Sequence, residues 1–234
     1  MEFAFTEEQA MIAETARGFF AEHATSARTR QAMAADGIDR ALWTGFCTEL
    51  GLAGIGVPEA LGGPGFDTLT YALVMEELSR GYASVADQCG LLELISSLLV
   101  RHGTPAQQAL LPAMLAMKTK VAYCITEPEA GTDVSGIRTT AVRDGDGWML
   151  NGGKIWIHNA PVADLGFVLA RTDKDAGNRG MSIFIVDLRL LGVPDPALVR
   201  PEPVLRLALA MLLAAVTSFL AARLGLRLFS EAEE

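Results

Sequence analysis

Two segments of the sequence bring together side chains that could hold a planar ring. The first, residues 123–133, leaves a short apolar run and enters a loop with proline and glycine, where Thr126 and Thr132 supply hydroxyls beside exposed backbone groups. The second, residues 151–159, carries Trp156, whose indole offers a flat apolar surface with polar neighbours at its edge. The same pattern also describes a sheet with a decorated turn and a core tryptophan, so the residues alone leave both interpretations open.

The elements before these segments are predicted to be helical. Thr6 with Gln9, and Thr104 with Gln107, have the spacing of reciprocal N-terminal caps, and the second pair encloses a proline at the first helical position. Apolar residues recur at helical spacing between them. We expect helices to begin after Thr6, over residues 40–50, from residue 67 or 68, over residues 85–102 and after Thr104, with residues 51–65 as a glycine-rich connection.

The region that contains the two segments is predicted to be a sheet. Short β-branched or alternating runs suggest strands over residues 121–126, 137–142, 148–150, 154–157, 165–170 and 181–186. The Asp-Gly-Asp-Gly run at residues 144–147 is a strong signal for a tight turn. We therefore predict an α+β protein, with an all-α helical domain over residues 1–120 followed by an antiparallel β middle domain over residues 121–188.

Composition excludes several functional classes. With 19 basic and 28 acidic residues the net charge is −9, which argues against a nucleic-acid binder. The cysteines Cys47, Cys89 and Cys124 have no metal-ligand spacing and suggest no framework of bridges. Cys47 and Cys89 are expected to be small core residues, whereas Cys124 faces either the core or a ligand. The N-terminus lacks the features of a secretory signal, so a reduced, cytoplasmic location is the simplest expectation.

The end of the chain, residues 189–234, has a different composition. Four prolines lie close together, and the following stretch 207–222 contains no charge. As a helix this stretch would span about 24 Å, short of the ~30 Å hydrocarbon core of a membrane. Three interpretations stay open: a short membrane anchor, a helix packed on the middle domain, and the product of a shifted reading frame.

The two segments, in this order and at this spacing, resemble the acyl-CoA dehydrogenase family. The resemblance covers residues 1–188 and includes residues 56–59 with the glycine pair at 62–63. It implies an all-α N-terminal domain, a β middle domain and a C-terminal four-helix bundle, with FAD between the last two. The residues that the resemblance assigns to the cofactor are Tyr123, Ile125, Thr126, Gly131, Thr132, Trp156, Ile157 and His158.

The resemblance also implies roles for individual residues. Thr126 would meet the edge of the isoalloxazine ring, while Thr132 would lie near both the cofactor phosphates and the acyl-CoA substrate. Trp156 and Ile157 would flank the ring together with His158. The histidine departs from the family pattern, which has a small hydroxyl residue at that place, and imidazole is larger and titratable.

The family reaction needs a carboxylate that removes an α-proton while a hydride leaves the β-carbon for the flavin. The family takes this glutamate from the C-terminal bundle, whose motifs are absent from residues 189–234, so we assign no catalytic residue. Glu127 and Glu129 are the alternatives, but their loop is better interpreted as a cofactor border or a solvent-facing turn. No residue is assigned to a metal.

We therefore expect an FAD-dependent acyl-CoA dehydrogenase-like protein with little or no activity as this chain alone. The resemblance implies an acyl-CoA thioester as substrate, an electron-transfer flavoprotein as partner, and a homo-oligomer for the complete protein. Two other functions stay open. The chain could be a non-catalytic fragment that binds flavin or acyl-CoA, or a membrane-associated or interaction protein that works through residues 207–222.

Overall fold

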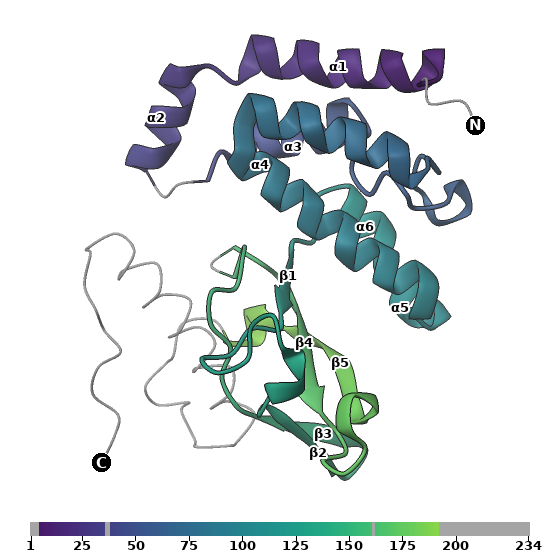
Figure 1. Cartoon of the computed structure of the whole chain (residues 1–234), viewed down its shortest axis with the longest axis vertical. Helices are drawn as coiled ribbons and strands as arrows, with labels where there is room; N and C mark the ends of the chain where they lie inside the picture. The colour runs from purple at the N-terminus through teal and green to yellow at the C-terminus, as the bar shows by residue number, and fades with distance from the viewer. Residues whose placement is uncertain (1–4, 36–37, 161, 192–234) are drawn as a thin grey trace. The chain divides into compact units, whose positions relative to one another are not determined.

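The computed structural model describes residues 5–35, 38–160 and 162–191. The chain forms two compact units, residues 1–119 and residues 120–234 (Figure 1). The described part of the first unit contains helices and no strands, and that of the second contains all five strands. The apolar stretch 207–222 and its three interpretations lie outside the described residues.

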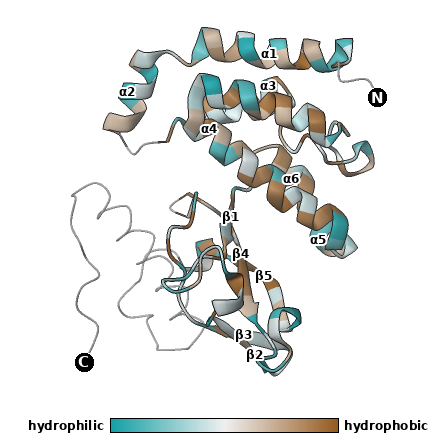
Figure 2. Ribbon diagram, in the orientation of Figure 1, coloured by the Kyte–Doolittle hydropathy of each residue, from teal (hydrophilic) through white to brown (hydrophobic). Residues whose placement is uncertain are grey.

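The first unit is built around one long helix, α4. Its helices are α1 (Glu7–His23), α2 (Ser26–Ala34), α3 (Arg40–Glu49), α4 (Thr68–His102), α5 (Pro105–Gln108) and α6 (Leu111–Leu115), with a single 3-10 turn at Glu59–Leu61. Helix α1 lies along α4, and both α3 and α6 also pack on α4 (Figure 1). Helix α4 is more apolar than α1 (Figure 2), and it supplies more buried residues than any other helix of this unit.

The helix starts predicted after Thr6, at residue 40, at residue 67 or 68 and after Thr104 are confirmed. Thr6 and Gln9 form a reciprocal capping box at α1, and Thr104 and Gln107 form another at α5. Asp67 caps α4, where its carboxylate accepts a hydrogen bond from the Thr70 N–H at 2.7 Å. Helix α2 was not predicted, because none of its side chains is buried and it therefore has no apolar stripe.

The prediction of two helices within α4 is partly right. The helical segment runs from Thr68 to His102, but it has a kink at Tyr82, whose backbone angles are non-helical, φ −156° and ψ 92°. The helix is therefore broken at Tyr82, three residues before the predicted start. Gly81 beside the break permits a close contact with α1, since a Cβ atom there would lie 2.4 Å from the Cβ of Phe20.

The second unit contains a five-stranded sheet. Its strands are β1 (Val121–Cys124), β2 (Thr140–Asp144), β3 (Gly147–Asn151), β4 (Leu165–Arg171) and β5 (Met181–Asp187). The order is β1-β4-β2-β3, and β5 also pairs with β4. The predicted tight turn is confirmed, because β2 and β3 form a hairpin in which Asp144 pairs with Gly147 and Gly145 has φ +57°.

The prediction of a purely antiparallel sheet is wrong. Strand β4 runs parallel to β1, with Val121 opposite Leu165, and meets β2 in parallel through the single pair Thr140 and Arg171. The sheet is therefore mixed. Forty residues separate the end of β1 from the start of β4, and a connection of that length can return the chain in the same direction.

The predicted strand over residues 154–157 is also wrong. This segment is irregular, with Gly152 at φ +153° and Trp156 at φ +54°, and such angles do not occur in a strand. Only one member of the predicted segment, Ile157, joins the core of the second unit, where it packs with buried residues of β1, β2, β3 and β4. The segment therefore runs as a loop whose side chains alternate between buried and accessible positions.

Candidate functional site

An ion pair between Lys154 and Glu127 joins the two segments on which the sequence analysis focused. The Lys154 Nζ donates to Glu127 Oε1 at 2.7 Å and to the carbonyl of Ile125 at 2.8 Å. The lysine side chain is completely buried and the glutamate nearly so. The backbone N–H of Ile155 also donates to the carbonyl of Thr126 at 2.9 Å. Side-chain and backbone bonds therefore fix loop 151–159 against loop 123–133.

The carboxylate of Glu127 is saturated with donors. Its oxygens also accept the backbone N–H groups of Arg138 at 2.7 Å and Thr139 at 3.0 Å. Burial alone would raise the pKa of Glu127, but these hydrogen bonds outweigh it and hold that pKa below its usual value. Burial lowers the pKa of Lys154, and the bond to Glu127 opposes this shift. Glu127 is therefore an anionic anchor of the loop, with its lone pairs occupied.

Beyond this anchor the chain makes a narrow turn. Glu127 and Ala130 exchange two backbone hydrogen bonds, at 2.9 and 3.2 Å. Gly131 and Thr132 follow on the surface, and a Cβ atom at Gly131 would have no neighbour within 4 Å. Glu129 points to solvent, where it forms an ion pair with Arg138. The turn thus leaves open space above exposed backbone groups.

Trp156 is held away from the core by its neighbours. Its side chain is 70% exposed, while Lys154 before it and Ile157 after it are buried. Its left-handed backbone, φ +54°, is uncommon for a bulky residue and unfavourable without a glycine. An exposed aromatic ring in a strained conformation is a recognised feature of ligand sites. The indole therefore lies on the surface of the second unit, where it is accessible to a ligand.

The other predicted site residues divide by exposure. Tyr123, Ile125 and Thr126 are half-buried, and burial raises the pKa of Tyr123. His158 is exposed, as are Gly131 and Thr132, whereas the side chain of Ile157 lies in the core. Both segments therefore belong to one local assembly, in which Ile157 serves as an inward anchor.

Cys124, whose orientation the sequence left open, faces the core. Its side chain packs among Ala122, Val168 and Ile157. Burial raises the pKa of its thiol to about 12, so it is a protonated core residue at neutral pH.

Sequence reasoning missed two features of the site. The first is the anchoring pair, in which the one lysine of the two segments selects Glu127 from three acidic residues. The second is Asn159, which has φ +61° and whose Nδ2 is buried without a hydrogen-bond acceptor among the described residues. An asparagine in the left-handed region is a recognisable turn signal, but an unpaired amide can only be found in three dimensions.

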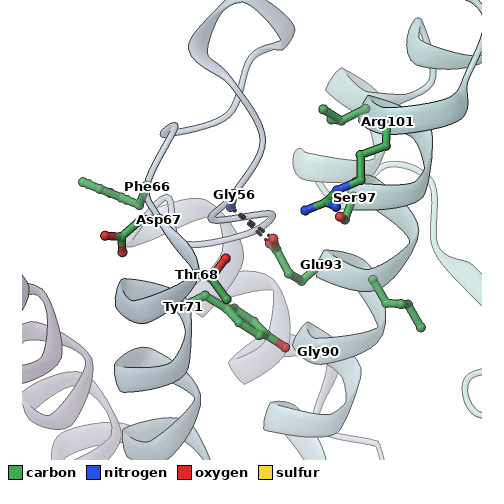
Figure 3. Close-up of a pocket in the computed structure, with 11 residues that line it drawn as sticks. Gly56, Phe66, Asp67, Thr68, Tyr71, Gly90, Glu93, Ser97 and Arg101 are labelled. Carbon is green, nitrogen blue, oxygen red and sulfur yellow. Dashed lines mark hydrogen bonds between the residues drawn. The ribbon is translucent and has the colours of Figure 1, made fainter.

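The first unit contains a separate cavity of about 520 Å³. It lies between the two ends of α4 and the preceding loop, with Glu93, Ser97 and Arg101 on one wall and Tyr71 opposite (Figure 3). Glu93 accepts the N–H of Gly56 through both oxygens, at 3.2 and 3.3 Å. Burial raises the pKa of Glu93, because this contact replaces only part of its hydration. None of these residues was predicted to form a site.

Comparison with known families identifies the two units. Residues 6–118 match the model of the acyl-CoA dehydrogenase N-terminal domain, and residues 122–199 match that of the middle domain. The chain belongs to the acyl-CoA dehydrogenase family. The helical N-terminal domain and the β middle domain are therefore confirmed, with a mixed sheet in place of the predicted antiparallel one.

Relatives within the acyl-CoA dehydrogenase family agree with this assignment. The caffeyl-CoA reductase–Etf complex subunit CarC of Acetobacterium woodii is 42% identical over 148 residues, which are 62% of this chain and 39% of that protein. Butyryl-CoA dehydrogenase from Megasphaera elsdenii superposes with a TM-score of 0.72 at 34% identity, over 80% of this chain and 50% of that one. The FAD complex of PigA superposes with the same TM-score at 27% identity, over 80% and 49%. The chain therefore spans half or less of each of these relatives.

Proposed function

We propose that this chain provides the helical domain and one wall of the flavin site of an FAD-dependent acyl-CoA dehydrogenase. The single observation that supports this most strongly is Trp156, exposed and strained on a loop that the Lys154–Glu127 pair fixes to residues 123–133. We further propose an acyl-CoA thioester as substrate and an electron-transfer flavoprotein as partner. Homo-oligomers and a cytoplasmic location complete the proposal.

The residues of the site fit a flavin nucleotide. The indole of Trp156 is available for stacking, and the open space above Gly131 admits a ligand close to the backbone. The hydroxyl of Thr132 is exposed and can donate to a phosphate oxygen. The buried amide of Asn159 lacks an acceptor. Tyr123, Thr126 and His158 complete the border that would hold FAD, with Thr132 also toward the acyl-CoA.

When bound, FAD would accept the hydride that leaves the β-carbon of the acyl group. The residues described here would bind and orient it, and Trp156 would exclude water from one side of the ring. Neither glutamate of the loop is placed to remove the α-proton. Glu127 is buried with its lone pairs occupied, and Glu129 lies in solvent paired with Arg138. We therefore propose that the base lies in another part of the complete enzyme, and that this chain alone has little or no turnover.

A flavin titration tests this proposal. Purified chain is titrated with FAD while tryptophan fluorescence and the visible spectrum are recorded, and acyl-CoAs of several chain lengths are then added anaerobically. We expect weak binding, because a ligand held on one side loses much of its buried area, and no bleaching of the flavin absorbance. A stoichiometric yellow complex whose flavin absorbance bleaches with acyl-CoA would refute the proposal that this chain lacks the catalytic base.

Two variants test whether FAD binds at Trp156 and not at another tryptophan. Trp156→Ala should abolish the remaining FAD binding, whereas Trp148→Ala should retain it, since Trp148 lies on β3 against Phe184. Equal binding by both variants would refute the placement of the flavin. The alternative function, a non-catalytic fragment that binds flavin or acyl-CoA, predicts a different result in one experiment. When a C-terminal bundle from a relative is added, such a fragment would still bind FAD or acyl-CoA but would show no turnover.

A further inference from the structure

Cys47 and Cys89 face each other inside the first unit. Their Sγ atoms are 4.0 Å apart, although 42 positions separate the residues in the chain. Cys47 lies on α3 and Cys89 on the second segment of α4, and the two side chains are 3% and 7% exposed. Both are free thiols. Both side chains are small core residues, as the sequence predicts, and their contact is visible only in three dimensions.

We propose that Cys47 and Cys89 form an intramolecular disulfide when the protein meets a small two-electron oxidant of the peroxide class. The site is independent of the flavin proposal, because it lies entirely within the helical unit. In the reduced protein the two thiols form a weak S–H···S contact across the interface of α3 and α4. Oxidation would replace this contact with a covalent bond between the two helices.

Formation of the bond requires the two sulfurs to approach each other. A disulfide has an S–S length of about 2.05 Å, so the 4.0 Å between the sulfurs must shorten by roughly 2 Å. Rotation of the two side chains about their Cα–Cβ bonds moves the sulfurs without moving the helices. Helices α3 and α4 are already packed against each other, so no new interface has to form.

The reaction balances with peroxide as the only co-reactant. One cysteine sulfur attacks a peroxide oxygen, the O–O bond breaks, and the products are a sulfenic acid and one water. The second sulfur then attacks the sulfenic sulfur and expels a second water. Two thiols and one hydrogen peroxide thus yield one disulfide and two waters, and the peroxide takes up two electrons.

The burial of Cys47 and Cys89 favours a small oxidant over a large one. Hydrogen peroxide is close to water in size and can reach a side chain that is 7% exposed, whereas so buried a sulfur cannot make the in-line attack on the S–S bond of a tripeptide disulfide such as oxidised glutathione. The contact with Cys47 and burial both raise the pKa of Cys89, so the resting Cys89 thiol is protonated. The same proximity means that a sulfenic acid at either residue has a thiol beside it.

Peptide mapping tests the proposal. The reduced chain is treated with hydrogen peroxide, remaining thiols are alkylated, and tryptic peptides are analysed without reduction. We expect one linked species that joins peptide 41–80 to peptide 81–101, two mass units lighter than their sum, while the Cys124 peptide 121–138 is alkylated. Dithiothreitol should release both peptides, and the melting temperature of the oxidised chain should rise by about 5 °C or more.

Three variants serve as controls. Cys124→Ser should form the same linked species, whereas Cys47→Ser and Cys89→Ser should each lose it together with the rise in melting temperature. Oxidised glutathione in place of peroxide should give neither the linked species nor a glutathione adduct on these two cysteines. Separate sulfinic acids at Cys47 and Cys89 without a linked peptide, or a link between two chains, would overturn the proposal.

Discussion

Lys154 donates a hydrogen bond to Glu127 at 2.7 Å from a position where its side chain has no exposed surface. The ammonium group also bonds the carbonyl of Ile125, and the carboxylate takes two backbone N–H groups, so both charges are compensated without water. Such a pair contributes little net stability relative to apolar residues, but removal of one partner leaves a buried charge. Its role here is to fix two loops in one arrangement.

Substitution of Lys154 alone should therefore lower the free energy of unfolding strongly. Lys154→Met leaves the Glu127 carboxylate buried without its cation, and we expect a loss of about 3–5 kcal/mol in unfolding free energy. The measurement is denaturant unfolding followed by circular dichroism. Lys174→Met, at an exposed position, should change stability by less than about 0.5 kcal/mol. The double variant Glu127→Gln with Lys154→Met should recover part of the loss, and equal losses in single and double variants would contradict the pairing.

The same pair predicts how stability depends on acid pH. The folded pKa of Glu127 lies below its unfolded value, so the unfolded state binds the proton first as the pH falls. The contribution of Glu127 is therefore complete above its unfolded pKa and is lost as the pH falls through its folded pKa. Urea unfolding between pH 3 and pH 7 should show a smaller acid loss in the double variant than in the wild type. Parallel pH profiles would exclude a lowered pKa.

Two glycines of α4 should respond oppositely to alanine. At Gly81 the new Cβ would lie 2.4 Å from the Cβ of Phe20, and we expect Gly81→Ala to destabilise by about 1–3 kcal/mol. At Gly90 the nearest atom is the flexible methyl end of Met75 at 3.3 Å, so Gly90→Ala should gain up to about 1 kcal/mol in helix propensity. Thermal melts of both variants test this. A stabilised Gly81→Ala would show that α1 and α4 can separate without cost.

These two glycines also show what the sequence could not provide. The capping boxes at Thr6 and Thr104 were predictable, because each depends on residues three positions apart. The break at Tyr82 lies beside the close contact of Gly81 with α1, and the parallel pairing of β1 with β4 joins residues 44 positions apart. Neither leaves a local signal. The strand predicted over residues 154–157 is wrong because β-branched and aromatic residues also occur in loops, and here the positive φ of Trp156 is incompatible with a strand.

The two segments of the candidate site were predictable from the sequence, but the contacts that join them were not. Family resemblance located both segments, and residues such as Thr132 and Trp156 are exposed as a ligand border requires. The anchoring of those segments by Lys154 and the unpaired amide of Asn159 became visible only in three dimensions. Burial of a charge depends on which distant atoms surround it, and a single sequence does not contain that information.

Glu93 should make the first unit less stable when it is ionised. Burial raises its folded pKa above its unfolded value, so the folded state holds the proton more tightly and stability falls as the pH rises through this interval. Glu93→Gln keeps an acceptor for the N–H of Gly56 but carries no charge. We expect a higher melting temperature than the wild type at neutral pH and a difference that shrinks toward pH 4. Glu59→Gln, at an exposed position, should show no such trend.

Replacement of Trp156 by glycine should stabilise the fold and abolish FAD binding. Its side chain is 70% exposed, and its positive φ costs on the order of 1 kcal/mol, which a glycine would not incur. We therefore expect Trp156→Gly to be as stable as the wild type or more stable by up to about 1 kcal/mol. Trp148→Gly should instead destabilise, because that indole packs on Phe184 and the guanidinium of Arg143 lies 4.8 Å from its ring.

Urea unfolding and an FAD titration on the same samples give both quantities for each variant. A stable Trp156→Gly variant that no longer binds flavin would mean that the strained backbone of Trp156 serves ligand binding and not the stability of the fold. A destabilised Trp156→Gly variant would mean that the indole contributes to the fold, and the interpretation of Trp156 as a presented ligand surface would have to be abandoned. Unchanged FAD binding by a stable Trp156→Gly variant would place the flavin elsewhere on the chain.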